Sequence, residues 1–110
     1  MKVNKDFCPV RDIISYLGDK WSILVILKLS MSASMRFSEL QREIPDISQK
    51  MLTQTLRKLE KMSLIVRTVY PEVPPRVEYN LSQLGISFVD TMSPIISWAN
   101  KNKKLILEHY

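Results

Sequence analysis

The hydrophobic and polar positions between residues 47 and 62 alternate with the period of an α-helix. Apolar side chains recur every three or four residues, at Leu52, Leu56, Leu59 and Met62. The opposite side of the same helix carries a narrow polar stripe, formed by Lys50, Thr53, Gln54, Arg57 and Lys61. The pattern predicts an amphipathic helix that begins after Ser48, with one side in a core and the polar stripe exposed.

After Met62 the pattern changes to that of two paired strands. Residues 64–70 are rich in β-branched and aromatic side chains, and residues 76–81 alternate between polar and apolar positions. Residues 71–75 include three prolines, which cannot donate to a strand ladder and therefore belong in the tip of a ribbon. The segment 35–37 is too short to assign, but it could pair with this ribbon as an edge strand.

Capping residues and prolines divide the rest of the chain into helices. The segment that follows Asp19 is apolar on nearly all sides, so we expect it at the centre of the fold. Pro94 lies inside the last helical region and predicts a kink or a break there. The expected helices are 9–17 led by Pro9, a second one capped by Asp19, 39–44 capped by Ser38, and 82–107 capped by Ser82.

The order of these elements is that of a winged helix-turn-helix. A short helix, a tight turn and a longer helix occupy about residues 38–62, and the ribbon, or wing, occupies about residues 64–81. The chain has 110 residues, of which 45% are hydrophobic, enough for one domain with a core. We therefore expect a single, mainly α domain over residues 1–110.

Basic charge is concentrated in the predicted helix and ribbon. The whole chain has 16 basic and 11 acidic residues and a net charge of +5. Residues 47–76 hold six basic residues against two acidic ones, so this segment supplies four of those five charges. A polyanion is the natural partner of such a segment, and the alternative is a solvated helix face beside a charged hairpin.

The sequence lacks the residues that several other functions need. Cys8 and His109 are its only cysteine and histidine, which excludes an internal disulfide and a Cys/His metal cluster. There is no catalytic triad and no glycine-rich phosphate loop, so we expect neither an enzyme nor a cofactor. No signal-peptide or membrane-spanning run is present, so we expect a cytoplasmic protein without a membrane partner.

The polar stripe and the ribbon suggest double-stranded DNA as the partner. Lys, Arg, Gln and Thr are the side chains that contact phosphates and base edges in a groove. Arg76, beside the ribbon tip, has two interpretations: a DNA contact, or an ion pair with Glu72 or Glu78. The candidate DNA-binding residues are Ser48, Gln49, Lys50, Thr53, Gln54, Arg57, Lys58, Lys61 and Arg76.

Several strings resemble the HxlR-type family of bacterial winged-helix regulators, relatives of the MarR group. They include Gly18-Asp-Lys-Trp21, Arg36-Phe-Ser-Glu-Leu40, residues 47–54 and residues 70–79. The resemblance implies a homodimeric transcription factor that dimerises through its first and C-terminal helices, here about 9–17 and 82–107. Two departures, Asp19 where the family often has glycine and Ser32-Ala-Ser34 in a loop, lie outside the polar stripe.

The chain itself also favours a homodimer. The last helical region carries more apolar side chains than a small three-helix core requires, including Phe88, Met92, Ile95, Ile96 and residues 105–107. A twofold dimer presents two reading helices to successive major grooves, so its operator is expected to be an inverted repeat.

Cys8 is a candidate sensor of oxidants or electrophiles. It precedes Pro9, and a thiol at a helix N-terminus has a lowered pKa and greater reactivity. Some members of the resembled family sense oxidants through a cysteine at this place. The alternatives are an inert, packed cysteine with a small-molecule effector bound near Trp21 or Trp98, or a winged helix used for protein contacts. The Lys/Thr/Gln/Arg character of the polar stripe argues against the last of these.

Overall fold

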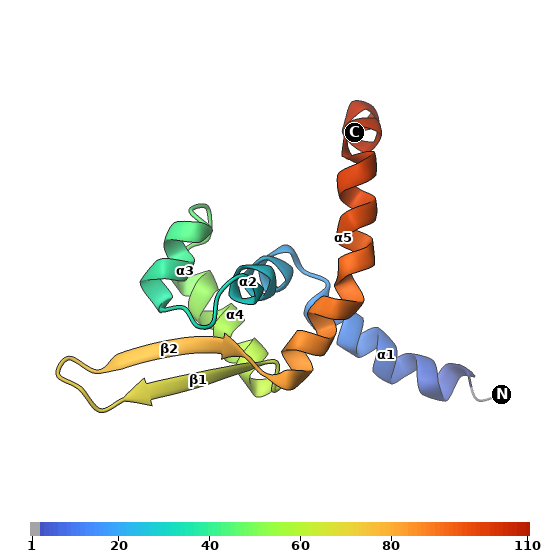
Figure 1. The fold of residues 1–110 in the computed structure, drawn as a ribbon. Helices are drawn as coiled ribbons and strands as arrows, with labels where there is room; N and C mark the ends of the chain where they lie inside the picture. Colours follow the sequence, from blue (N-terminus) through green and yellow to red (C-terminus); the bar gives the residue numbers. More distant parts are fainter. Residues whose placement is uncertain (1–2) are drawn as a thin grey trace.

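The computed structural model describes the backbone of residues 3–110 and the side chains from Val10 onward. Within this part, five helices and two strands follow one another along the chain (Figure 1). They are α1 Val3–Leu17, α2 Lys20–Ser30, α3 Phe37–Glu43, α4 Gln49–Lys61, β1 Ile65–Tyr70, β2 Arg76–Leu81 and α5 Gln83–His109.

The elements form a packed body with two helical arms. The body consists of α2, α3, α4 and the antiparallel ribbon β1–β2, which extends to one side of the helices (Figure 1). The arms are residues 10–16 of α1 and residues 93–109 of α5, and Figure 1 shows them pointing away from the body. In the arms, most apolar side chains are exposed.

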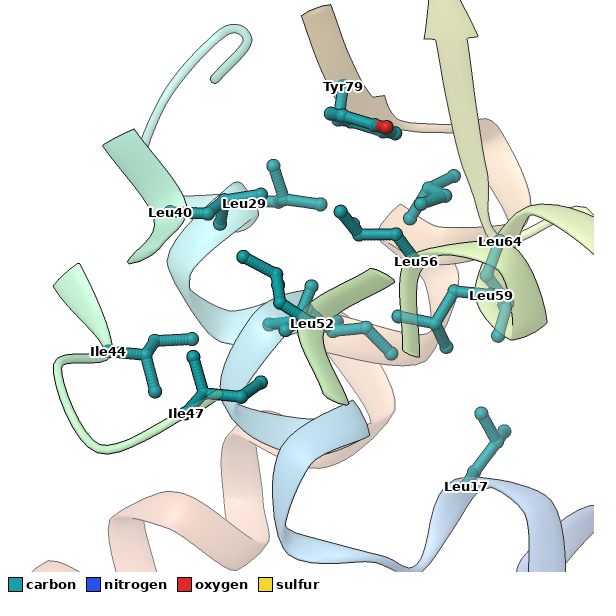
Figure 2. Packing of buried hydrophobic residues seen from close by; sticks show 13 residues of the cluster. Leu17, Leu29, Leu40, Ile44, Ile47, Leu52, Leu56, Leu59, Leu64 and Tyr79 are labelled. Carbon is teal, nitrogen blue, oxygen red and sulfur yellow. The ribbon is translucent and has the colours of Figure 1, made fainter. Parts of the chain in front are cut away.

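The core lies between α2, α4 and the base of the ribbon (Figure 2). Val25, on α2, is fully buried, which confirms the central place expected for this helix. The apolar side of α4 meets it with Leu52, Leu56 and Leu59, all but fully buried as the periodicity predicts. Tyr79 of β2 closes the core at the ribbon.

Three of the predicted helix caps are confirmed. The Asp19 carboxylate accepts a hydrogen bond from the backbone N–H of Ser22 at 2.9 Å. The Ser48 hydroxyl accepts from the N–H of Met51 at 3.0 Å. The hydroxyl of Ser82 starts α5 in the same way. Each cap satisfies a backbone donor that the first turn leaves without a helical partner.

The predicted cap at Ser38 is wrong. α3 begins two residues earlier than predicted, at Phe37, with Arg36 in the capping position. The carboxylate of Glu39 accepts the backbone N–H of Arg36 at 2.7 Å, and so holds the first turn from inside the helix. Just before it, Met35 forms a single antiparallel bridge to Tyr79, the edge pairing considered for residues 35–37.

Two prolines lie inside helices, and at Pro9 this differs from the predicted boundary. α1 begins at Val3, so Pro9 is not its first residue and Cys8 lies within the helix. A proline removes one backbone hydrogen bond and need not end a helix whose neighbouring turns continue. Of the kink or break predicted at Pro94, the break does not occur, since α5 runs through this residue to His109. Asp90, whose carbonyl loses its donor there, is exposed, so water can hydrate that group.

Gly85 permits the closest approach between α5 and the body. A β-carbon at this position would collide with the backbone carbonyl oxygen of Leu64. The same carbonyl accepts the N–H of Ser82 at 3.0 Å, which fixes the first turn of α5 beside the start of β1. The absence of a side chain at Gly85 therefore allows α5 to leave the body in this direction.

Candidate nucleic-acid interface

The polar stripe of α4 is an exposed surface of the body. The apolar side of α4 is buried in the core. The opposite side, with Lys50, Gln54 and Arg57, is therefore exposed. These residues, with Gln49 and Thr53, line a shallow groove of about 490 Å³ along the helix. The body therefore holds α4 rigidly while the polar stripe is presented to a partner.

The stripe suits the major groove of DNA in its chemistry. At the N-terminus of α4, backbone N–H groups that lack helical partners favour an anion such as a phosphate. Ser48, Gln49 and Lys50 lie in this first turn. Gln54 and Arg57 follow one and two turns later, and each can make two hydrogen bonds to a single base edge.

Ion pairing separates two groups of basic residues. Within the part of the chain that the structure describes, no carboxylate lies within salt-bridge distance of Lys50, Arg57, Lys61 or Arg67. Lys58 and Arg76 both have such partners. The first group thus keeps its charge available for an external anion.

Lys58 has partners within the described chain, and its contact with DNA stays a prediction. Its Nζ donates to the carboxylate of Asp19 and to the backbone carbonyl of Tyr16, both at 2.6 Å. We call this arrangement the Lys58 clamp. It joins α4 to the junction between α1 and α2, and it draws the ammonium group away from the polar stripe. Helical periodicity places Lys58 next to Arg57 on α4. The position of the Lys58 ammonium group is set by its two acceptors in the clamp.

The clamp changes the ionisation of Asp19. Partial burial acts to raise the pKa of this carboxyl, but hydrogen bonds from Lys58 and from the N–H and hydroxyl of Ser22 outweigh burial. The positive charge of Lys58 acts in the same direction, and the pKa falls from 3.8 to about 2. Asp19 is therefore ionised at neutral pH and serves both as a helix cap and as the acceptor of the clamp.

Arg76 is held by intramolecular partners at the wing. Its guanidinium lies 3.1 Å from the carboxylate of Glu72 and 3.5 Å from that of Glu78, so the ion pairs considered as its alternative role are present. It also lies over the ring of Tyr70, 4.0 Å from the centroid. DNA contact by Arg76 stays a prediction, and it would require this residue to exchange or share these partners.

Arg67 lies beside the polar stripe although it was absent from the predicted site. It pairs in register with Tyr79 across the ribbon and shares with Arg57 a hollow of about 300 Å³ between α4 and β1. The five-residue tip provided the signal in the sequence: pairing outward from Tyr70 and Arg76 brings residue 67 opposite residue 79. Paired residues lie on the same side of a ribbon, here the side that meets α4.

The two tryptophans do not share a pocket. Trp21 packs partly against the core, with Lys20 Nζ 4.2 Å from its ring, whereas Trp98 is 59% exposed on the α5 arm. Trp21 lines a hollow of about 290 Å³ beside α4, and Ile13, Leu17 and Phe88 line two further hollows of about 270 and 570 Å³ between α1 and α5.

Other kinds of site are not found among the described residues. No group of three or more His, Cys, Asp or Glu side chains lies close enough together to hold a metal ion. No helix in that part of the chain is both long and apolar enough to cross a membrane. The side chain of Cys8 lies outside the described side chains.

A three-helix body with a reading helix and an antiparallel ribbon defines a winged helix-turn-helix protein. Residues 16–106 match the family model described as HxlR-like helix-turn-helix, and the chain belongs to this family. It is therefore a transcriptional regulator of the HxlR type, and the family is not one of enzymes.

Similar proteins agree with this assignment. An HTH-type transcriptional regulator from Methanothermobacter thermautotrophicus is 47% identical over 91 residues, covering 83% of this chain and 69% of that protein. The reduced form of the regulator YodB from B. subtilis is 35% identical with a TM-score of 0.74, covering 83% and 88%. The reduced form of the redox regulator HypR is 36% identical with a TM-score of 0.81, covering 93% and 99%.

Proposed function

We propose that this regulator binds an inverted-repeat DNA operator as a homodimer and reads it with the polar stripe of α4. The observation that carries the proposal is the exposed stripe itself. Its lysine and arginine side chains lack carboxylate partners within the described chain. A helix that only faced solvent would have no need of a row of unpaired Lys, Arg, Gln and Thr side chains beside a ribbon.

Within this proposal the residues of α4 have different tasks. Gln54 and Arg57 read base edges, because their side chains can make paired hydrogen bonds. Ser48, Gln49 and Lys50 hold a phosphate at the helix N-terminus, and Lys61 binds a backbone phosphate further along. Thr53 contacts DNA from the middle of the stripe, although its hydroxyl already donates to the Gln49 carbonyl at 2.9 Å.

The arms supply the dimer interface in this proposal. Ile13 and Ile14 of α1 are more than half exposed, and so are Leu105 and Leu107 of α5. Such a row of apolar side chains on two extended helices is typical of surfaces that a second subunit covers. Twofold symmetry would then place the two α4 helices in successive major grooves, about 34 Å apart.

The regulatory signal has two candidates. The neighbour YodB has been solved both reduced and diamide-treated, and HypR both reduced and oxidised. These neighbours support a response to oxidants or electrophiles at Cys8. The argument from a helix N-terminus no longer supports it, since α1 starts at Val3. The second candidate is a small apolar effector in the hollows between α1 and α5, with an inert Cys8.

A DNA partner also sets the expected place of action. The operator lies on the chromosome, so we propose the cytoplasm of a prokaryotic cell. A winged helix used for protein contacts remains the competing function, and the unpaired basic stripe argues against it because such interfaces are depleted in lysine.

The test is selection of bound duplexes from a random DNA pool, followed by footprinting of the enriched sequence. The proposal predicts an inverted repeat protected on two successive major grooves, and a complex of two chains by light scattering. Enrichment of no sequence, together with a monomer at micromolar concentration, would refute it. Repeating the footprint with and without diamide distinguishes the two candidate signals.

A further inference from the structure

The hollow between α4 and β1 has a composition suited to one particular anion. Its floor is apolar and is formed by Phe37, Leu56 and Tyr79. Its rim carries Arg57 from α4 and Arg67 from β1, two cations that come from different elements. An apolar floor strengthens the attraction between these cations and an incoming anion, because it keeps water from one side of the ion.

The remaining rim residues define the charge of the site. Thr53 adds a hydroxyl oxygen, and Glu60 adds one carboxylate. Two guanidinium groups against one carboxylate leave an excess of one positive charge. This excess matches a phosphodiester, which carries one negative charge, better than a phosphate monoester, which carries nearly two at neutral pH.

The position of the hollow links it to the DNA-reading surface. Thr53 and Arg57 line both this hollow and the groove along the polar stripe, so the two spaces adjoin. A helix that lies in a major groove has a sugar–phosphate backbone along its side, and a ribbon packed beside the helix faces that backbone. Arg67 is the third of the six residues of β1, slightly nearer the base of the ribbon than its tip.

We propose that this hollow holds a backbone phosphodiester of the operator, bound by Arg67, while Arg57 at the edge of the hollow adds its positive charge and Glu60 limits the affinity. The inference rests on the proposed function and adds a site to it. Arg67 makes a fork-like, sequence-independent contact with phosphate oxygens. The carboxylate of Glu60 repels the same phosphate. The protein therefore binds random DNA more weakly than its two arginines alone would allow.

The experiment measures binding of labelled duplexes to the full-length chain by fluorescence anisotropy over a range of salt concentrations. The duplexes are the sequence enriched by selection and a scrambled control. Arg67→Gln should weaken binding to both by about tenfold and reduce the salt slope by about 2, one for each subunit. Arg67→Lys should restore part of the loss, and Glu60→Gln should tighten binding to both duplexes. Lys28→Gln, a charge-matched change on α2 outside the polar stripe and the arms, should leave binding unchanged.

A methylphosphonate scan then locates the contact. One uncharged phosphate in each half-site should weaken the wild type strongly and have no further effect on Arg67→Gln. Equal behaviour of Arg67→Gln and Lys28→Gln, or equal methylphosphonate profiles of wild type and Arg67→Gln, would overturn the assignment while leaving the proposed function intact. Displacement of DNA by inorganic phosphate at constant ionic strength would overturn it in favour of a free-anion site. Failure of the wild type to bind any duplex would refute both.

Discussion

The body and the arms of this protein use the same kinds of residue in opposite ways. In the body, the leucines of α4 are buried against α2, so the chain covers this apolar surface by itself. In the arms, Leu105 and Leu107 are 59% and 69% exposed. The body therefore contains what it needs to fold around the reading helix, whereas the arms present a surface that a second subunit would complete.

The basic residues divide along a similar line. Lys58 and Arg76 are occupied by carboxylates of the same chain, while Arg57 and Arg67 have no such partner among the described residues. Residues adjacent in sequence, Arg57 and Lys58, thus serve different purposes: one is available to DNA and the other holds the body together. Charge counted along a sequence cannot make this distinction, because it depends on where acidic groups fold.

Leu52→Ala tests the body and should have the largest effect. Leu52 is fully buried, so truncation leaves a cavity and should lower the free energy of unfolding by about 2–5 kcal/mol. Val73→Ala, at the exposed ribbon tip, is the control and should change it by less than about 0.5 kcal/mol. Urea denaturation measures both, and equal effects would contradict the division between core and surface.

The double substitution Leu105→Ser with Leu107→Ser tests the arms. Each leucine that a dimer covers contributes about 1.5–3 kcal/mol, so the pair should shift the equilibrium toward monomer and weaken operator binding. Circular dichroism should remain that of a folded body. Sedimentation velocity measures the assembly, and Val73→Ser, an apolar-to-serine change at the exposed ribbon tip, is the control. A dimer of unchanged stability would show that the subunits meet elsewhere.

Gln54→Ala and Arg57→Ala test the polar stripe. Each should weaken operator binding by about 1–3 kcal/mol and blur preference at particular base pairs. Lys61→Ala should weaken operator and random DNA alike, because a phosphate contact carries no sequence information. Competition binding with single-base operator variants measures the preference. If all three variants lost only non-specific affinity, the reading residues would lie elsewhere.

The elements whose determinants are local could be predicted from the sequence, as α4 shows. Its apolar period, its Ser48 cap and the prolines after β1 all act within a few residues, and the structure places them as expected. The start of α1 was missed because Pro9 is compatible with both a first turn and a helix interior. The role of Lys58 was missed because its acceptor, Asp19, lies 39 residues away. To predict the position of Arg67, the register of the ribbon has to be combined with the position of α4.

Cys8→Ser tests the signal that acts on the arms. If Cys8 is the sensor, diamide should release the wild type from its operator, and a tenfold loss needs only about 1.4 kcal/mol of differential binding. Cys8→Ser should keep operator affinity and lose the response. Mass spectrometry confirms that the wild-type cysteine has reacted. Unchanged binding after complete modification would favour an effector in the hollows between α1 and α5.

Asp19→Asn tests the Lys58 clamp and should have the smallest effect. Asparagine is as good a helix cap as aspartate, so the substitution removes the charge and largely retains the cap. The carboxylate is 40% exposed, and solvent screening should therefore keep its contribution below about 1 kcal/mol at neutral pH.

The pH dependence identifies this contribution. The folded pKa of Asp19, about 2, lies below the ordinary value of 3.8, so ionised Asp19 stabilises the fold fully above about pH 4 and progressively less as pH falls toward 2. The stability difference between wild type and Asp19→Asn should shrink over that interval in urea titrations. Asp46→Asn is the control, since Asp46 meets Lys20 only at 3.8 Å on an exposed surface. A difference that stayed constant from pH 6 to pH 2 would mean that the clamp acts through hydrogen bonds alone, and that the charge on Asp19 contributes nothing to holding α4 against the start of α2.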